Sequence, residues 1–132
     1  MLLLHGWPGD RTDYREVALL VSAAADVIVP DLRGFGESDK HGADPAGQYN
    51  AAAQARSIIG LIDELALGRP VIGGYDIGSR IAQAIARDRP DLVRGLVIAP
   101  PLPGIGDRIL APLARPVATP RPNPAVTGWP DR

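Results

Sequence analysis

The stretch GGYDIGSR places an aspartate, Asp76, between Gly74 and Gly78, where the apolar run VIGG gives way to a segment of helical period. A carboxylate at the start of a helix has two common uses. It caps the free backbone N–H groups of the first turn, or it stays ionised beside the positive helix end and attacks an electrophilic carbon. The short motif by itself favours the capping interpretation.

Two nucleotide-binding patterns overlap this stretch, and neither fits. Gly73 to Gly78 matches the GxxxxG spacing of a phosphate-binding P-loop, but the lysine that this motif requires is absent and Ser79 follows Gly78 directly. The glycines at 73, 74 and 78 do not give the GxGxxG spacing of dinucleotide-binding loops either. The sharper alternative is a nucleophile elbow, a strained strand-to-helix turn that needs small residues two positions before and after the nucleophile. Gly74 and Gly78 meet that requirement.

A second glycine-rich loop, HGWPG, follows the apolar run LLL near the N-terminus. Elbow catalysis needs an oxyanion hole, made from the N–H after the nucleophile and a second N–H from the loop after an earlier strand. We expect the backbone amides of Ile77 and Trp7 to be these donors. Pro8 is expected to stiffen the loop, Gly6 to allow unusual backbone angles, and His5 to make a structural hydrogen bond.

Three motifs in this order, HGWPG, DLRGFGESD at residues 31–39 and the aspartate elbow, resemble the α/β-hydrolase superfamily, specifically its epoxide hydrolase and dehalogenase branch. The likeness covers residues 1 to about 105 and implies a partial α/β-hydrolase fold. It also implies that Asp76 opens a small apolar epoxide, or attacks a related electrophile, to form an alkyl ester. A histidine-activated water then cleaves the ester, and the resemblance implies no cofactor and no metal.

The sequence departs from this family pattern in several places. Typical members have a histidine before the aspartate and often a tryptophan after it, where this chain has Tyr75 and Ile77. Without that indole N–H to hold a departing halide, epoxide opening is favoured, and a dehalogenase stays the alternative. The family's second acid, catalytic histidine and cap tyrosines come later in the chain, and no histidine follows Asp76 here. We therefore expect a fragment with little activity alone, or else a non-catalytic interaction module that self-associates through exposed sheet edges.

The remaining polar residues of these loops are interpreted as structural. Asp31, Arg33 and Asp39 are expected to form a hydrogen-bonded turn framework. Neither His5, in the oxyanion loop, nor His41, in a polar loop, is predicted to act as a general base.

Short apolar runs alternate with segments of helical period in the order βαβαβαβ, which predicts an α/β fold with a parallel sheet of about four strands and flanking helices. The strands are expected near residues 1–4, 26–30, 70–74 and 94–98. Helices are expected from Thr12 or Asp13 as N-cap, from about Tyr49 to Leu67, and over GSRIAQAIARD. Each glycine-rich loop follows the carboxyl end of a strand, where ligands bind in such sheets.

Composition limits the remaining possibilities. The chain has 132 residues, a formal net charge of −1 and no cysteine. We expect one domain, a hydrolase core at 1–114, followed by a disordered proline- and arginine-rich tail at 115–132. Such a charge attracts neither nucleic acid nor an anionic membrane, and no apolar run reaches the roughly 18 residues of a membrane span. The lack of cysteine excludes disulfides and thiolate zinc sites, and a cytoplasmic protein is the expectation.

Overall fold

The computed structural model of the chain describes residues 1–40, 42 and 44–99. Its sheet has three parallel strands, β1 (Leu2–Leu4), β2 (Val71–Tyr75) and β3 (Gly95–Ala99), in the spatial order β1-β2-β3. The predicted core boundary at 114, the tail at 115–132 and His41 lie outside the described residues. The α/β architecture with a parallel sheet is as expected.

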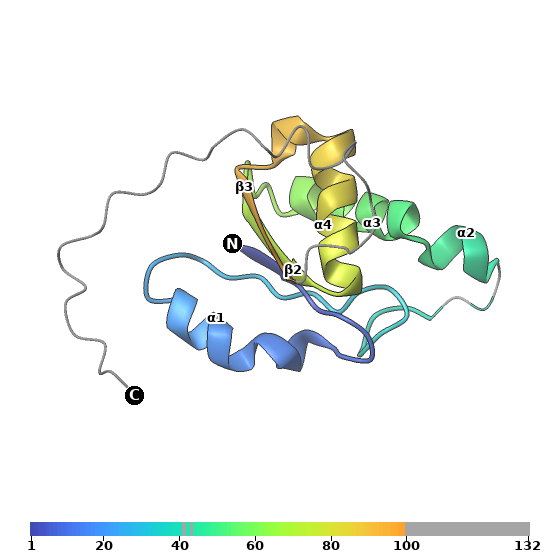
Figure 1. The fold of residues 1–132 in the computed structure, drawn as a ribbon, viewed down its shortest axis with the longest axis horizontal. Helices are drawn as coiled ribbons and strands as arrows, with labels where there is room; N and C mark the ends of the chain where they lie inside the picture. Colours follow the sequence, from blue (N-terminus) through green and yellow to red (C-terminus); the bar gives the residue numbers. More distant parts are fainter. Residues whose placement is uncertain (41, 43, 100–132) are drawn as a thin grey trace. The chain divides into compact units, whose positions relative to one another are not determined.

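Helices join the strands. The 3-10 turn η1 (Arg11–Tyr14) continues into α1 (Arg15–Val21), and α2 (Pro45–Tyr49) precedes α3 (Ala51–Glu64). Helix α4 (Ile77–Asp88) and the short turn η2 (Pro90–Leu92) connect β2 to β3. In Figure 1, α3 and α4 lie on the same side of β2 and β3, so this side of the sheet is covered.

The prediction of a second strand at residues 26–30 is wrong. Only one residue of this segment pairs with the sheet, through an isolated parallel bridge between Ile28 and Leu2. Ile28 N donates to Met1 O and Leu3 N donates to Ile28 O, both at 2.9 Å. Pro30 has no N–H with which to extend the ladder, and the chain leaves the sheet edge there.

Two helix predictions also need correction. Thr12 and Asp13 are not the N-cap of the first helical segment, because the side chain of Asp10 accepts the hydrogen bond from Thr12 N at 2.7 Å. The helix predicted from Tyr49 to Leu67 is two helices, divided at Asn50. The Asn50 backbone is extended, and its side chain accepts from Ala53 N at 2.8 Å as the N-cap of α3.

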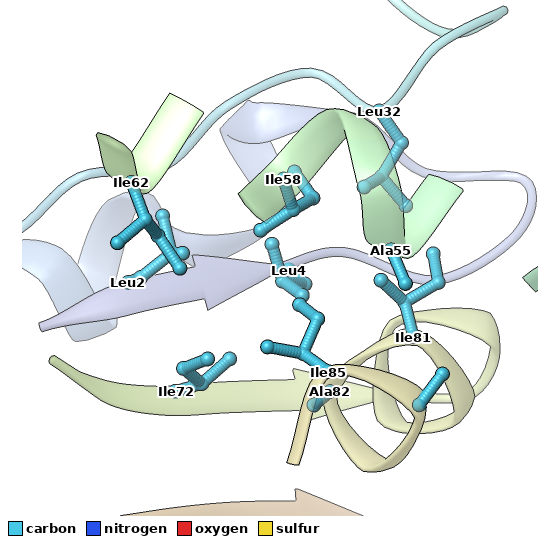
Figure 2. Packing of buried hydrophobic residues seen from close by; sticks show 11 residues of the cluster. Leu2, Leu4, Leu32, Ala55, Ile58, Ile62, Ile72, Ile81, Ala82 and Ile85 are labelled. Carbon is cyan, nitrogen blue, oxygen red and sulfur yellow. The ribbon is translucent and has the colours of Figure 1, made fainter. Parts of the chain in front are cut away.

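The hydrophobic core lies between the sheet and the helices α3 and α4 (Figure 2). Alternation along β1 directs Leu2 and Leu4 into this core, where Ile72 of β2 joins them. The helices contribute side chains at helical spacing, Ile58 and Ile62 from α3 and Ile81 and Ile85 from α4, and Leu32 comes from the loop after the isolated bridge. This packing holds β1, β2 and the start of α4 as one unit.

The side of the sheet that faces away from α3 and α4 is less covered. Helix α1 has no buried residue, its Leu19 and Leu20 are 66% and 78% exposed, and Val97 of β3 is 59% exposed. Among the residues that the structure describes, no helix is both long and apolar enough to cross a membrane.

Candidate active site

The backbone at Asp76 is strained. Asp76 lies between the last residue of β2 and the first residue of α4, with φ 48° and ψ −118°, a conformation that costs a non-glycine residue about 1–3 kcal/mol. Neighbouring hydrogen bonds hold it there, since Asp76 N donates to Ala99 O at 3.0 Å and Ser79 Oγ donates to Asp76 O at 2.7 Å. The side chain makes no capping hydrogen bond, so the capping interpretation of Asp76 is wrong.

Close backbone approach explains the two glycines around Asp76. A Cβ on Gly74 would lie 2.6 Å from the carbonyl carbon of Gly78, and one on Gly78 would lie 2.6 Å from His5 O and collide with Leu4 O. The start of α4 therefore packs directly on the end of β1. Any side chain at position 78 would push the helix away from the strand and move Asp76 with it.

The loop after β1 contacts the carboxylate. Trp7 N donates to Asp76 Oδ2 at 3.0 Å, although the two residues are 69 positions apart. The register accounts for this, because Leu4 pairs with Gly74 and both chains then leave the sheet at the same end. Gly6 lies so near Asp76 that a Cβ on Gly6 would be 2.9 Å from the Asp76 Cβ. Pro8 follows Trp7 through a cis peptide bond, and Ile77 directly follows Asp76.

His5 has a structural environment. Its side chain is fully buried, and its Nε2 accepts the backbone N–H of Leu32 at 3.0 Å. The proton therefore resides on Nδ1, which donates to Gly6 O at 2.9 Å, and the ring packs edge-on against Phe35. Both ring nitrogens are engaged within the protein, which agrees with the predicted structural role of His5.

The Asp31 carboxylate anchors the loop that follows the isolated bridge. It is 3% exposed and accepts hydrogen bonds from the backbone N–H groups of Arg11 at 2.7 Å and Glu37 at 3.0 Å, together with an ion pair to the Arg11 guanidinium. Burial by itself would raise the pKa of Asp31. These donors outweigh burial and hold the pKa of Asp31 below its ordinary value.

Arg33 and Asp39 extend this framework. Arg33 donates to the side chains of Gln48 at 2.7 Å and Ser57 at 2.6 Å, and Gly34 N donates to Asp39 O at 2.9 Å. The interpretation of residues 31–39 as a hydrogen-bonded turn framework is confirmed by these contacts.

We expect Asp31→Asn to destabilise the protein at neutral pH by about 1–3 kcal/mol, because the amide NH2 would face backbone donors or the Arg11 guanidinium. The folded-state pKa is lowered, so the stabilisation by Asp31 is present above its unfolded pKa and is lost as pH falls through the folded value. The variant should therefore lose less stability than the parent as the pH falls from about 5 to about 3, the range in which a solvated aspartate takes up its proton. Urea unfolding across this range measures both effects, with Asp26→Asn, at an exposed aspartate, as control.

A tyrosine contact that sequence reasoning missed supports the same loop. The Tyr75 hydroxyl donates to Asp13 Oδ2 at 2.5 Å, and this hydrogen bond together with burial raises the pKa of Tyr75. The Tyr75 ring fills the space beside Gly6, and the Asp13 carboxylate with the Tyr75 hydroxyl fills the space beside Gly9, so a Cβ at either glycine would collide with them. Tyr14 packs edge-on against Tyr75, and burial raises the pKa of Tyr14 to about 12. No motif in the sequence signals this link between η1 and the end of β2.

A pocket of about 610 Å³ opens next to Trp7 and Ile77, the residues whose amides were expected to form the oxyanion hole. Its walls are largely apolar and include Trp7, Phe35, Tyr49, Ile77, Arg80 and Ile81. Asp76 itself is not part of the wall, although its neighbour Ile77 is. Sequence reasoning missed Arg80, and the available signal was its position four residues after Asp76, in the first turn of α4. Within the part of the chain that the structure describes, no three metal-ligating side chains converge.

The sequence model of the α/β hydrolase fold family matches residues 1–121, and the chain belongs to this family. It is 33% identical over 117 residues to the soluble epoxide hydrolase of Corynebacterium sp. (strain C12), covering 86% of this chain and 40% of that protein. It is 35% identical over 104 residues to the fluoroacetate dehalogenase of Burkholderia sp., covering 78% of this chain and 34% of that protein. The chain thus spans well under half the length of these relatives.

Comparison with solved structures finds members of the same family. A thermophilic esterase from Thermogutta terrifontis superposes with a TM-score of 0.68 at 39% identity, covering 74% of this chain and 35% of that one. The epoxide hydrolase CorEH superposes with a TM-score of 0.62 at 34% identity, covering 74% and 33%. The relatives are therefore hydrolases that include epoxide hydrolases, a dehalogenase and an esterase.

Proposed function

We propose that this chain carries the nucleophile half of an epoxide hydrolase-like active site, with Asp76 as the nucleophile. The observation that carries the proposal is the Asp76 backbone, which is strained at φ 48° while its carboxylate makes no helix-capping bond. A residue that only capped α4 would relax to ordinary dihedrals and bond to the first-turn amides. Strain that the surrounding packing maintains is typical of functional turns.

The proposed first step is opening of the epoxide. One Asp76 carboxylate oxygen attacks an epoxide carbon, the carbon–oxygen bond of the ring breaks, and the electron pair remains on the epoxide oxygen, which takes a proton from a solvent water and leaves hydroxide. The product is a 2-hydroxyalkyl ester of Asp76. Trp7 N already donates to Asp76 Oδ2 at 3.0 Å, so the second carboxylate oxygen would stay oriented while the first attacks.

In the proposed second step, water attacks the carbonyl carbon of the ester, which releases the diol and restores the carboxylate. The amides of Trp7 and Ile77 are the proposed oxyanion hole for the negative charge on the ester oxygen, with His5, Gly6 and Pro8 shaping the loop. The proposal for the whole site needs a base that activates this water. The 132 residues contain no histidine after Asp76.

The proposed substrate is a small epoxide with an apolar body, or a related electrophile. The name of the Corynebacterium relative and the apolar wall of the adjacent pocket support it. Dehalogenation is the second proposal, supported by the likeness to the Burkholderia enzyme. Ile77 offers no side-chain N–H to a departing halide, which favours the epoxide.

A non-catalytic role in self-association is a different proposal, supported by the exposed Leu19, Leu20 and Val97. Sedimentation equilibrium tests it, since a chain that stays monomeric at all concentrations would contradict it.

Covalent labelling tests the nucleophile. With styrene oxide, we expect the chain to gain the mass of one epoxide molecule, located on Asp76 by peptide mapping, and Asp76→Asn to abolish the labelling. Asp44→Asn is the matched control, because Asp44 also has a positive φ of 47° but its side chain caps α2 through Gly47 N. Equal labelling of several carboxylates, or labelling that persists in Asp76→Asn, would contradict the proposal.

A further inference from the structure

The charged residues that line the pocket beside Ile77 are all positive. Two of its wall residues, Lys40 and Arg80, are cationic, and none is acidic. Arg80 is exposed, and no hydrogen bond or ion pair occupies its guanidinium within the described residues. By contrast, Arg11, Arg87 and Arg89 each pair with a nearby carboxylate. An unpaired guanidinium on the wall of a pocket is a ready partner for an anion.

Lys40 has spare hydrogen-bonding capacity as well. Its Nζ donates to Gly36 O at 2.6 Å and to Ser38 O at 3.4 Å, two carbonyls of its own loop. An ammonium group has three N–H donors, so one is left for a ligand. Because the two carbonyls fix the ammonium at the pocket wall, a ligand would lose less free energy in ordering the Lys40 side chain.

The rest of the pocket wall suits the apolar part of a ligand. Trp7, Phe35, Ile77 and Ile81 supply apolar surface, and a volume of about 610 Å³ matches the size of a small-molecule site. The ligand that fits both parts has an apolar group and one anionic end.

The position of Arg80 relates the anionic end to the nucleophile. Arg80 follows Asp76 by four residues at the start of α4, and Arg80 N donates to Asp76 O at 3.4 Å. An anion held by the guanidinium would therefore lie about one helical turn from the elbow. Asp76 would repel this anion, but Arg80 and Lys40 together leave the site with net positive charge.

We propose that this pocket selects a small electrophile that carries a carboxylate, with Arg80 holding the carboxylate through its planar guanidinium and Lys40 adding a second positive charge. A carboxylate matches the fork of a guanidinium through two parallel hydrogen bonds. The assignment of the ligand as substrate rests on the proposed function. Binding of the carboxylate does not, and it can be measured without any reaction.

The binding test uses two unreactive probes of nearly equal shape, phenylacetate and its neutral analogue phenylacetamide. Titration of the 15N-labelled chain, followed by the backbone amides of Ile77 and Ile81 and by arginine Nε–Hε signals, should show that phenylacetate binds more tightly. Arg80→Gln should weaken phenylacetate binding about 5- to 10-fold, because it removes a two-bond ion pair that solvent screens at an exposed site, and should leave phenylacetamide binding unchanged. Lys40→Gln should give a smaller loss of the same kind.

Arg56→Gln is the control, because Arg56 is an exposed arginine of α3 outside the pocket wall, and its removal changes the net charge equally. Equal affinity for the two probes, or equal effects of Arg80→Gln and Arg56→Gln, would overturn the proposal. Inorganic phosphate serves as a competitor. If phosphate displaces phenylacetate at equal concentration, the pocket binds small anions without selecting a carboxylate, and the proposal is wrong.

A labelling test separates this proposal from the proposed reaction. 3-Phenylglycidate and styrene oxide differ by one carboxylate, and we expect the former to label Asp76 faster, with the advantage lost in Arg80→Gln. If phenylacetate binds through Arg80 but neither epoxide labels Asp76, the carboxylate site stands and the proposed reaction fails. If styrene oxide labels Asp76 while phenylacetate does not bind through Arg80, the reaction stands and the carboxylate site is overturned.

Discussion

Incubated with excess styrene oxide, the 132-residue chain is expected to form no diol in a steady state, even where Asp76 becomes alkylated. The two half-reactions need different groups. Ring opening needs an ionised carboxylate and a bound electrophile, whereas ester cleavage needs an activated water. No histidine follows Asp76 in this sequence, and the ring nitrogens of His5 are both engaged with backbone groups. Loss of a general base costs roughly 10²–10⁴-fold in rate.

Diol release and intact mass, followed in the same sample, check this expectation. Alkylated chain should accumulate, and diol should stay below one equivalent per chain. Sustained diol formation that disappears in Asp76→Asn would mean that these residues contain a base which the structure has not revealed. Sustained formation that survives in Asp76→Asn would remove Asp76 from the reaction altogether.

Gly78→Ala is expected to be strongly destabilising. The new Cβ would meet the carbonyl oxygens of Leu4 and His5, which belong to the backbone at the end of β1 and cannot rotate away. Either α4 moves off β1 or the pairing of Leu4 with Gly74 is disturbed. Overpacking of this kind destabilises the folded state by about 3 kcal/mol. The higher helix propensity of alanine than of glycine offsets about 1 kcal/mol of this loss. A net loss of about 2 kcal/mol is a large part of the stability of a small domain.

Gly60→Ala is the matched control for this substitution. Gly60 also lies within a helix, α3, but nothing stands within 4 Å of the position that its Cβ would take. Alanine there should stabilise the protein by about 0.5–1 kcal/mol. Urea unfolding of both variants measures the difference. A Gly78→Ala variant as stable as the parent would contradict the close approach of α4 to β1.

Much of the fold and part of the site could be predicted from residue types. The alternation of apolar runs with helical segments predicted the parallel sheet, because a strand buried on both faces needs a continuous apolar run. The predictions that were wrong depended on single backbone groups. Pro30 lacks the N–H that a strand at 26–30 would use, and the extended backbone of Asn50 divides what the apolar spacing presents as one helix.

The sequence by itself placed glycines on both sides of Asp76, and such residues permit a sharp turn between a strand and a helix. Tertiary structure decided what that aspartate contacts. The bond from Trp7 N to Asp76 and the hydroxyl of Tyr75 on Asp13 join segments far apart in the chain. Such contacts depend on which strands pair and in what register, and β1 lies beside β2 only because the helices α3 and α4 bury both strands in one core.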